Sequence, residues 1–295
     1  MEHFIKRKLD QIFKDFKQSA VKAEGLCECK ELTYKGRNLP DYNSQIIQQY
    51  YLLRFFPAYL AEYYLMYSKL IEKDFLPDNN LNVLSIGCGS GIDYWSLHFA
   101  LSDFGKKYTK TIRYTGIDAI DWNYKEDFGA KKFKFHTNNI ASLKWKKPFP
   151  YNVIVFPKSI GEFTNDDFKT LCELFKNTEF AKDKICGLCS LMDEGKESDA
   201  KRFRKLARIV MKKNEYECLD EMKNYWTMKK NQGIRSICSG FIYPDDILEE
   251  VKNAKELCPT YIENGESCEV NCDTLNRWPI LKTKYINYKL LRFER

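Results

Sequence analysis

The sequence lacks any apolar run that approaches the ~20 residues needed to cross a bilayer. Its N-terminal segment, MEHFIKRKLDQIFKDFKQ, is charged throughout and has no apolar stretch of the kind found in signal peptides. The composition, 44% hydrophobic and 30% charged, is that of an ordinary soluble globular protein. We therefore expect a cytoplasmic protein with no membrane partner.

Histidine is scarce, and the cysteines do not form a recognisable metal-binding motif. The three histidines, His3, His98 and His136, are near none of the close cysteine pairs. Of these pairs, only Cys186 and Cys189 have a two-residue spacing, and they fall on a predicted core strand. The others are Cys27-x-Cys29 and Cys268-x-x-x-Cys272. A structural metal site is the less favoured reading, and we expect free cysteines that pack as small apolar residues, with no metal.

Three glycines stand at alternate positions, Gly87, Gly89 and Gly91, directly after the short apolar run 83–86. A helical pattern begins at once after them. A strand that turns tightly into a helix presents backbone N–H groups and the positive end of the helix dipole to a ligand. A second predicted strand, residues 111–117, ends at Asp118, where a carboxylate is placed to accept hydrogen bonds from ribose hydroxyls.

The segment Ser85-Ile-Gly-Cys-Gly-Ser-Gly91 resembles the acidic-x-Gly-x-Gly-x-Gly motif of class I S-adenosylmethionine (SAM)-dependent methyltransferases, with Ser85 in place of the carboxylate. A dinucleotide dehydrogenase would need a glycine where Ile92 stands. A tight strand–helix turn in another α/β protein is the alternative. The resemblance implies SAM as cofactor, with these cofactor-binding residues in the sheet domain: Ser85, Gly87, Cys88, Gly89, Gly91, Asp118, Ala119 and Asn139.

The same resemblance implies an α/β fold with a Rossmann-like, mostly parallel seven-stranded sheet, helices on both faces and an N-terminal helical extension. Periodicity predicts further strands at 132–136, 151–156, 184–191 and 284–293. Helices are predicted at 1–24, 92–104, 164–177, 199–213 and 244–256, and a loop at 258–276. An asparagine after the third strand, Asn139, is positioned either to bind adenine or to cap a turn.

The acceptor is expected at the tip of the fourth strand, because an open α/β sheet binds ligands at the carboxyl ends of its strands. There Lys158 and Glu162 are the catalytic candidates, for proton removal or for holding the acceptor, although both are compatible with an ordinary surface position. The (Asp/Asn)-Pro-Pro-(Tyr/Phe) motif of adenine and cytosine amine methyltransferases is missing. No cysteine lies between Cys88 and Cys172, which argues against cytosine C5 chemistry. Oxygen, ring-nitrogen or small-molecule acceptors remain.

An aromatic segment, residues 44–73, predicts a helix that Pro57 kinks or divides. We predict that residues 1–78 form a helical extension or lid and that residues 79–295 form the SAM-binding domain. Tyr51 and Arg54 are placed near the methionine end of SAM in this interpretation. Core packing is the other reading of the aromatics, and a neighbouring acidic side chain is the other candidate partner of Arg54.

Two short segments are similar to the methyltransferase-like family tied to assembly of the mitochondrial small ribosomal subunit. They are Tyr51-x-x-Arg54-x-x-Pro57-Ala58 and Ile160-Gly161-Glu162-Phe163. The cysteine cluster of that family has no counterpart here. The resemblance implies work on the ribosome or on RNA.

Basic residues gather in two segments without any acid, Lys131–Lys147 and Lys201–Lys213, in a chain of net charge +7. They favour phosphate contacts if they form one surface, and a solvated helix face otherwise. The leading hypothesis is therefore a SAM-dependent methyltransferase with RNA slightly favoured as acceptor. The alternatives are a metabolite or natural-product methyltransferase and a non-catalytic ribosome assembly factor that keeps the SAM fold.

Overall fold

The computed structural model describes residues 1–23, 26–32, 39–73, 75, 80–104, 111–125, 133–145, 147–192, 196–222, 226–227, 232–264, 275–283 and 286–295. The chain divides into two compact units. The first comprises Met1–Ala61, Trp122–Tyr124 and Gln232–Thr283; the second comprises Glu62–Asp121, Lys125–Asn231 and Lys284–Arg295. These units do not follow the predicted boundary at residue 78, because a long helix runs on into the second unit and a late segment joins the first.

The second unit is built on one sheet of eight strands among the described residues, in the order β3-β2-β1-β4-β5-β8-β6, with β7 paired to β8. The strands β1 to β5 are parallel, and β8 is antiparallel to β5, β6 and β7. Their bounds are β1 Asn80–Ile86, β2 Thr111–Asp118, β3 Phe133–Thr137, β4 Val153–Pro157, β5 Lys184–Ser190, β6 Glu217–Cys218, β7 Trp226–Thr227 and β8 Asn287–Glu294. The predicted class I methyltransferase fold, with its antiparallel last strand, is confirmed.

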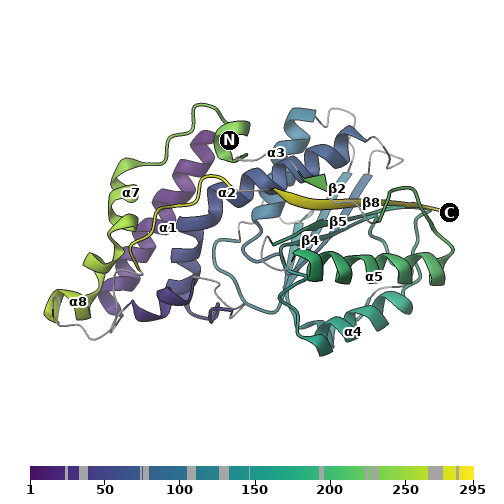
Figure 1. The fold of residues 1–295 in the computed structure, drawn as a ribbon, viewed down its shortest axis with the longest axis horizontal. Helices are drawn as coiled ribbons and strands as arrows, with labels where there is room; N and C mark the ends of the chain where they lie inside the picture. The colour runs from purple at the N-terminus through teal and green to yellow at the C-terminus, as the bar shows by residue number, and fades with distance from the viewer. Residues whose placement is uncertain are drawn as a thin grey trace. The chain divides into compact units, whose positions relative to one another are not determined.

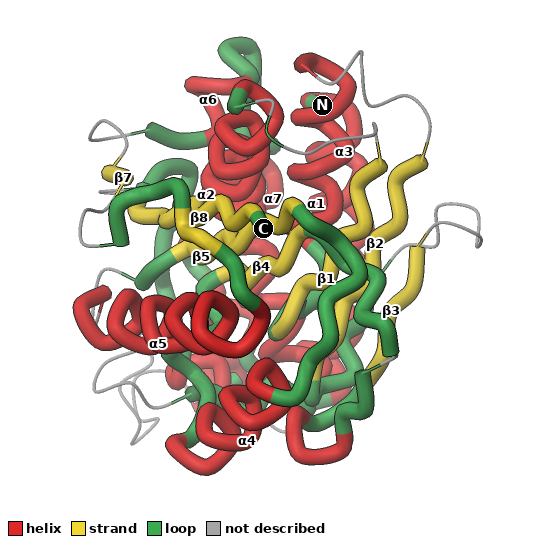
Figure 2. Tube along the Cα trace, turned by 90° about the vertical axis from the view of Figure 1, so that its right-hand side faces the viewer, coloured by secondary structure: helices red, strands yellow, loops and turns green. Residues whose placement is uncertain are grey.

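Helices cover both faces of this sheet (Figures 1 and 2). On one face lie α4 (Asn165–Lys176) and α5 (Lys196–Asn214), side by side. On the other face lies α3 (Ile92–Phe104). The α4 helix begins as the sequence predicts, because the Thr164 side chain accepts a hydrogen bond from the backbone N–H of Asp167 and so caps the helix.

Apolar side chains of β1, β4, β5 and β8 pack under α4 and α5 in a continuous core. Its largest members are aromatic, and Phe149, Phe156 and Phe203 are each at most 4% exposed. The ring of Phe156 lies 6.1 Å from that of Phe203, in an edge-to-face arrangement. This core fixes the carboxyl ends of the central strands relative to one another.

Helices dominate the first unit. They are α1 (Glu2–Lys22), η1 (Cys27–Glu31), the first part of α2 (Gln45–Glu72), α6 (Ile234–Ile237), α7 (Asp245–Lys252), η4 (Ala254–Leu257) and α8 (Pro259–Asn264); the second unit also holds η3 (Ile140–Ser142). The predicted N-terminal helix is confirmed, and its apolar stripe of Ile5, Leu9 and Phe16 is fully buried. The loop predicted at 258–276 is wrong at its start, where α8 forms, and residues 265–274 lie outside the described residues.

Pro57 lies inside α2 without dividing it, since the helix continues from Gln45 to Glu72. A proline has no N–H to donate to the carbonyl four residues earlier, which here is that of Leu53. The hydroxyl of Tyr243 donates to this carbonyl instead, at 2.9 Å. In the same turn, the carbonyl of Arg54 accepts from the N–H of Ile280 at 2.7 Å. The late segment 232–283 therefore belongs to the first unit because it supplies donors to α2.

Among the described residues, no helix combines the length and the apolar character that spanning a membrane requires.

We expect Tyr243→Phe to destabilise the chain by about 1–3 kcal/mol, because it leaves the buried Leu53 carbonyl without a donor. The cost should shrink when Pro57→Ala is present, since an alanine restores an N–H to that carbonyl. Urea unfolding of the two single variants and the double variant measures the coupling. Tyr261→Phe, on α8, is the matched control. Equal costs of Tyr243→Phe with and without Pro57 would contradict this account.

Candidate functional site

The glycine turn follows β1 and requires glycine for two reasons. Gly87, Gly89 and Gly91 have φ values of 72°, 55° and 80°, in the left-handed region that other residues rarely adopt. A Cβ on Gly87 would also lie 2.2 Å from the Cβ of Ser159, and one on Gly91 would lie 2.5 Å from Cζ of Phe135. The turn is therefore packed closely against the segment after β4 and against β3.

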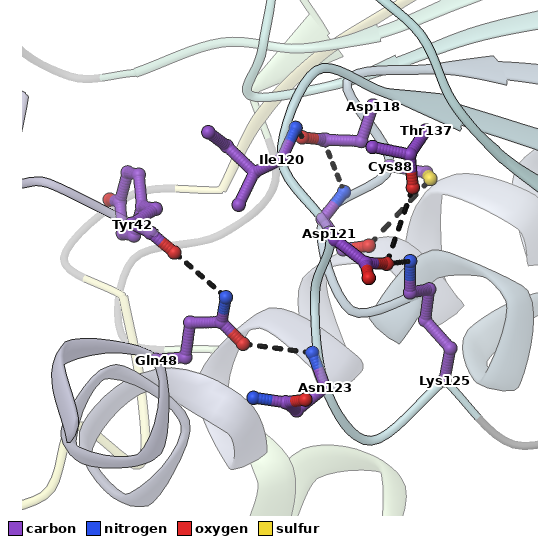
Figure 3. Close-up of polar contacts among 10 residues, drawn as sticks. Tyr42, Gln48, Cys88, Asp118, Ile120, Asp121, Asn123, Lys125 and Thr137 are labelled. Carbon is purple, nitrogen blue, oxygen red and sulfur yellow. Dashed lines mark hydrogen bonds and ion pairs between the residues drawn. The ribbon is translucent and has the colours of Figure 1, made fainter. Parts of the chain in front are cut away.

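Asp118, the last residue of β2, is tied to this turn. Its Oδ2 accepts a hydrogen bond from the N–H of Gly89 at 2.8 Å, and its Oδ1 accepts one from the N–H of Ile120 at 2.9 Å. Figure 3 shows the carboxylate above the loop that continues to Asp121, which contacts Lys125 and Thr137. Asp118 is thus fixed at the carboxyl edge of the sheet.

The residues present at this edge fit SAM. A carboxylate at the tip of β2 accepts hydroxyl donors such as those of a ribose, and Gly87 and Gly89, both partly exposed, carry no Cβ to obstruct a ligand. The turn leads directly into α3, whose N-terminus is the positive end of its dipole. Ala119 is exposed beside Asp118, whereas the side chain of Cys88 is 5% exposed and points into the protein.

Two predicted cofactor residues are placed differently from the rest. Ser85 is fully buried in β1, below the turn. Asn139 is exposed, and its Oδ1 accepts a hydrogen bond from the N–H of Ala141 at 3.0 Å. It therefore caps η3, in agreement with the predicted alternative of a turn cap. A direct contact of either residue with SAM stays a prediction.

Tyr51 and Arg54 lie in the first unit, where both pack against aromatic rings. The Tyr51 ring is 5.4 Å from that of Trp122. Arg54 is 5% exposed; its Nη1 donates to the Leu32 carbonyl at 3.3 Å, and its guanidinium lies 4.9 Å over the Phe55 ring. Core packing therefore describes their contacts within this unit, and their role at the cofactor stays a prediction.

A hydrogen bond within the first unit orders the segment around Trp122. The side chain of Gln48 accepts from the N–H of Asn123 at 2.8 Å and donates to the carbonyl of Tyr42 at 2.7 Å (Figure 3). The rings of Tyr42 and Trp122 lie 4.9 Å apart. Trp122 is accordingly 7% exposed and packed on the rings of Tyr42 and Tyr51.

The residue directly after β4 is Lys158, which has a left-handed φ of 57°. Its Nζ lies 2.9 Å from Oε1 of Glu62 and donates to the Leu191 carbonyl at 3.2 Å. The hydroxyl of Ser190, at the end of β5, also donates to Glu62, which is fully buried. The charge of Lys158 is therefore balanced by a carboxylate from α2.

Glu62 is a residue that sequence reasoning missed. It is the only charged residue between Arg54 and Lys69 in an aromatic helix, and that isolation was the available signal. A lone acid in an apolar helix is expected to have a buried partner, because an unpaired buried charge is costly.

Glu162 lies four residues further along the same segment and is partly exposed. Among the described residues, no hydrogen bond or ion pair is made by its carboxyl group. Burial, followed by the negative charges of Asp118 and Asp199, raises the pKa of Glu162 to about 8, although Lys158 acts in the opposite direction. A carboxyl group with this pKa exchanges its proton near neutral pH, as a general acid or base must.

Asp93, in the first turn of α3, is a second functional candidate that the sequence did not reveal. It is fully buried, and its carboxylate accepts from the hydroxyls of Tyr114 at 2.8 Å and Tyr67 at 3.2 Å. Burial raises the pKa of Asp93 to about 6, while the hydrogen bonds from Tyr114 and Tyr67 oppose the rise. A carboxyl group thus lies beside Ser85, the position at which the family motif carries its acid.

Most cysteines in the described parts of the chain are buried free thiols, whereas Cys27 is exposed and Cys218 and Cys238 are half-buried. Cys186 and Cys189 are fully buried free thiols of β5, and burial raises the pKa of each well above its usual value. Cys268 and Cys272 lie outside the described residues. In the described ranges, His, Cys, Asp and Glu side chains form no group of three or more that could hold a metal ion.

Among the described residues, the helix α4 packs against elements of both basic segments. α4 contacts both η3, near the first segment, and α5, which carries the second. Acids stand on α4, including Asp166 and Asp167 in its first turn. Lys131, Lys132 and Lys146 of the first segment lie outside the described residues. A continuous basic groove that joins the two segments and would favour RNA stays a prediction.

No protein-family model matches this chain, and no curated protein matches its sequence. Among solved structures, the plantazolicin methyltransferase BpumL in complex with a triazolic desmethylPZN analog and SAH is 16% identical, with 98% of this chain and 100% of that chain covered and a TM-score of 0.42. The YcgJ protein from Bacillus subtilis is 14% identical, with 78% of this chain and 98% of that chain covered and a TM-score of 0.40. At such low identities and TM-scores, these similarities carry no argument, and the fold is established by the strand order alone.

Asp93→Asn should flatten the pH dependence of unfolding between about pH 4 and pH 6. The folded-state pKa of Asp93, about 6, lies above the ordinary 3.8, so its stabilising contribution is complete below the ordinary value and is lost as the pH rises through about 6. At ~1.4 kcal/mol per pKa unit, the free energy of unfolding of the wild-type chain should fall by about 3 kcal/mol more than that of the variant over this pH range. Urea unfolding across this range measures it, with exposed Asp183→Asn as control. Parallel curves for wild type and Asp93→Asn would contradict the burial argument.

Proposed function

We propose that the second unit binds SAM at the glycine turn and transfers its methyl group to a small-molecule acceptor held beside the segment after β4. The observation that carries this proposal is a convergence. The glycine turn after β1, Asp118 at the tip of β2 and Glu162 after β4 meet at one edge of a sheet with the class I strand order. Ligands of open α/β sheets bind at this edge.

When bound, SAM supplies an activated methyl group, so the protein's task is to hold and align the reactants. Asp118 accepts hydrogen bonds from the ribose hydroxyls in this proposal. The glycine turn lets the backbone approach the ligand closely and directs the N-terminus of α3 towards it. The carboxylate is already oriented by the N–H groups of Gly89 and Ile120, which lowers the cost of binding.

Glu162 is the proposed general base. It takes the proton that an acceptor hydroxyl or amine loses as its oxygen or nitrogen bonds to the methyl group. Asp118 and Asp199 support this role, because their negative charges favour the protonated form of Glu162. Lys158, the other predicted catalytic residue, has its ammonium group between Glu62 and the Leu191 carbonyl, so we assign it to orienting the segment.

The charges at this edge favour a small molecule over RNA, which the sequence had placed slightly ahead. Asp118 and Asp199 are acidic, and the nearby cation, Lys158, is balanced by buried Glu62. Such an edge repels phosphate groups. The similarity to the mitochondrial ribosome-assembly family stays a prediction.

Asp118→Ala should weaken SAM binding at least about tenfold, because hydrogen bonds to a charged group contribute roughly 1.5–3 kcal/mol each. Isothermal titration calorimetry with SAM measures the loss. Asp183→Ala, an exposed aspartate at the amino end of β5, is the matched control and should bind like wild type. Unchanged affinity in Asp118→Ala would remove the carboxylate from the proposed cofactor site.

Glu162→Gln should lower methyl transfer by roughly 10²–10⁴-fold, the usual contribution of a general base, while SAM affinity is unchanged. Transfer is measured with labelled SAM into separated small-molecule, RNA and protein fractions of a cell extract. Glu217→Gln, an exposed residue of β6, is the control. We expect label in the small-molecule fraction. Label in the RNA fraction would refute the acceptor class, and full activity of Glu162→Gln would refute the general base.

A further inference from the structure

Arg202 belongs to the basic segment of α5, but its guanidinium is turned into the second unit. Its Nη1 donates to the carbonyls of Ile160 at 2.9 Å and Phe163 at 2.7 Å. Its Nη2 donates to Oδ1 of Asn165 at 3.1 Å. The guanidinium also lies 5.0 Å over the Phe168 ring. The guanidinium group of Arg202 is thus engaged within the protein, unlike an arginine on a phosphate-binding surface or on a solvated helix face.

The two carbonyls that Arg202 holds lie on either side of Glu162 in the chain. Between them, the N–H of Glu162 donates to the Ser159 carbonyl at 2.9 Å and closes a turn. A guanidinium is planar and rigid, so one group that binds both carbonyls restricts the backbone between them. The backbone of Glu162 is therefore held both from within its own turn and from α5.

The same helix approaches this segment closely at Gly161. A Cβ on Gly161 would lie 2.3 Å from Oδ1 of Asp199, one turn before Arg202 on α5. Asp199 is 1% exposed, and its Oδ2 accepts from the N–H of Met192 at 3.3 Å, just after β5. Hence α5 supports the Glu162 segment at two points, and Gly161 permits the contact because it has no side chain.

From this geometry we infer that Arg202 is a positioning residue, which fixes the segment Ile160–Phe163 and thereby sets the location and surroundings of the Glu162 carboxyl group. The inference rests on the proposed function for its catalytic consequence, but the structural claim stands on the hydrogen bonds alone. By this inference, one arginine of the basic segment on α5 has a structural role within the protein.

The basic neighbours of Arg202 provide the control. Arg208, on the same helix, is exposed, and among the described residues its guanidinium makes no hydrogen bond or ion pair. Arg208→Ala removes the same charge from α5 without touching the Glu162 segment. Arg202→Lys keeps the charge, but a single ammonium group does not reproduce the bridge to two carbonyls and an amide. Gly161→Ala displaces the segment from the other side.

The experiment titrates the Glu162 carboxyl by carbon-13 NMR with labelled glutamate, the signal being assigned from its loss in Glu162→Gln. In wild type we expect a pKa near 8, because of burial, Asp118 and Asp199. In Arg202→Ala it should move by about one unit or more towards the ordinary value, as the carboxyl group leaves that environment. Arg202→Lys and Gly161→Ala should shift it in the same direction, and Arg208→Ala should not.

Activity gives the second readout. Arg202→Ala should lower the rate of methyl transfer roughly 10- to 100-fold through misplacement of Glu162, with SAM affinity unchanged. If Glu162→Gln retains full transfer, the proposed function fails, yet the titration still decides the role of Arg202. A Glu162 pKa that is the same in wild type, in folded Arg202→Ala and in Gly161→Ala would overturn the inference. Should Arg202→Ala not fold, Arg202→Lys and Gly161→Ala decide it.

Discussion

The site depends on one constraint, the left-handed glycine turn that joins β1 to α3. Because Gly87 has no Cβ, Ser159 packs directly against the turn, and its hydroxyl donates to the carbonyl of Ile86. Because the N–H of Gly89 points outward, it meets the carboxylate of Asp118. A single turn thus ties the ends of β1, β2 and β4 together. A larger side chain at Gly87 would push Ser159 and the segment after β4 away from the turn.

Charge balance around this turn is arranged by residues distant in sequence. Glu62, on α2, forms an ion pair with Lys158, so the ammonium group of Lys158 is not left uncompensated in the interior. Arg202 arrives from α5 and holds carbonyls on both sides of Glu162. Glu162 itself is left with nearby acids and a high affinity for its proton. The surrounding pairs are thus structural, while in the proposed function the carboxyl group between them accepts the proton.

The fold was largely predictable from sequence, because its determinants are local. The apolar run before the glycines specified β1, the acid after the next run marked the end of β2, and Thr164 marked the start of α4. The mostly parallel sheet with helices on both faces followed from the family resemblance. Whether α2 would continue through Pro57 or be divided there was left open by the sequence, because the donors from Tyr243 and Ile280 lie more than 180 residues away along the chain.

The candidate site was predictable only in part. Glycines and a terminal acid have a fixed spacing, so Gly87, Gly89, Gly91 and Asp118 could be named. Residues that become partners only through tertiary packing have no fixed spacing in the sequence. Glu62 and Asp93 were missed for this reason. The inward contacts of Arg202 were not predicted for the same reason, because the sequence of a basic helix does not indicate which arginine side chain points into the protein. Burial and pairing decide these roles, and both depend on the assembled unit.

The most direct test of the central claim is hydrogen–deuterium exchange, followed by mass spectrometry, with and without SAM. The account predicts slower exchange in peptides that cover the glycine turn, 86–92, and the end of β2, 117–120, because these amides line the proposed cofactor site. Peptides at the opposite edge of the sheet, around Asp183, should exchange at an unchanged rate. Protection confined to other parts of the chain, or no protection at any SAM concentration, would contradict the account.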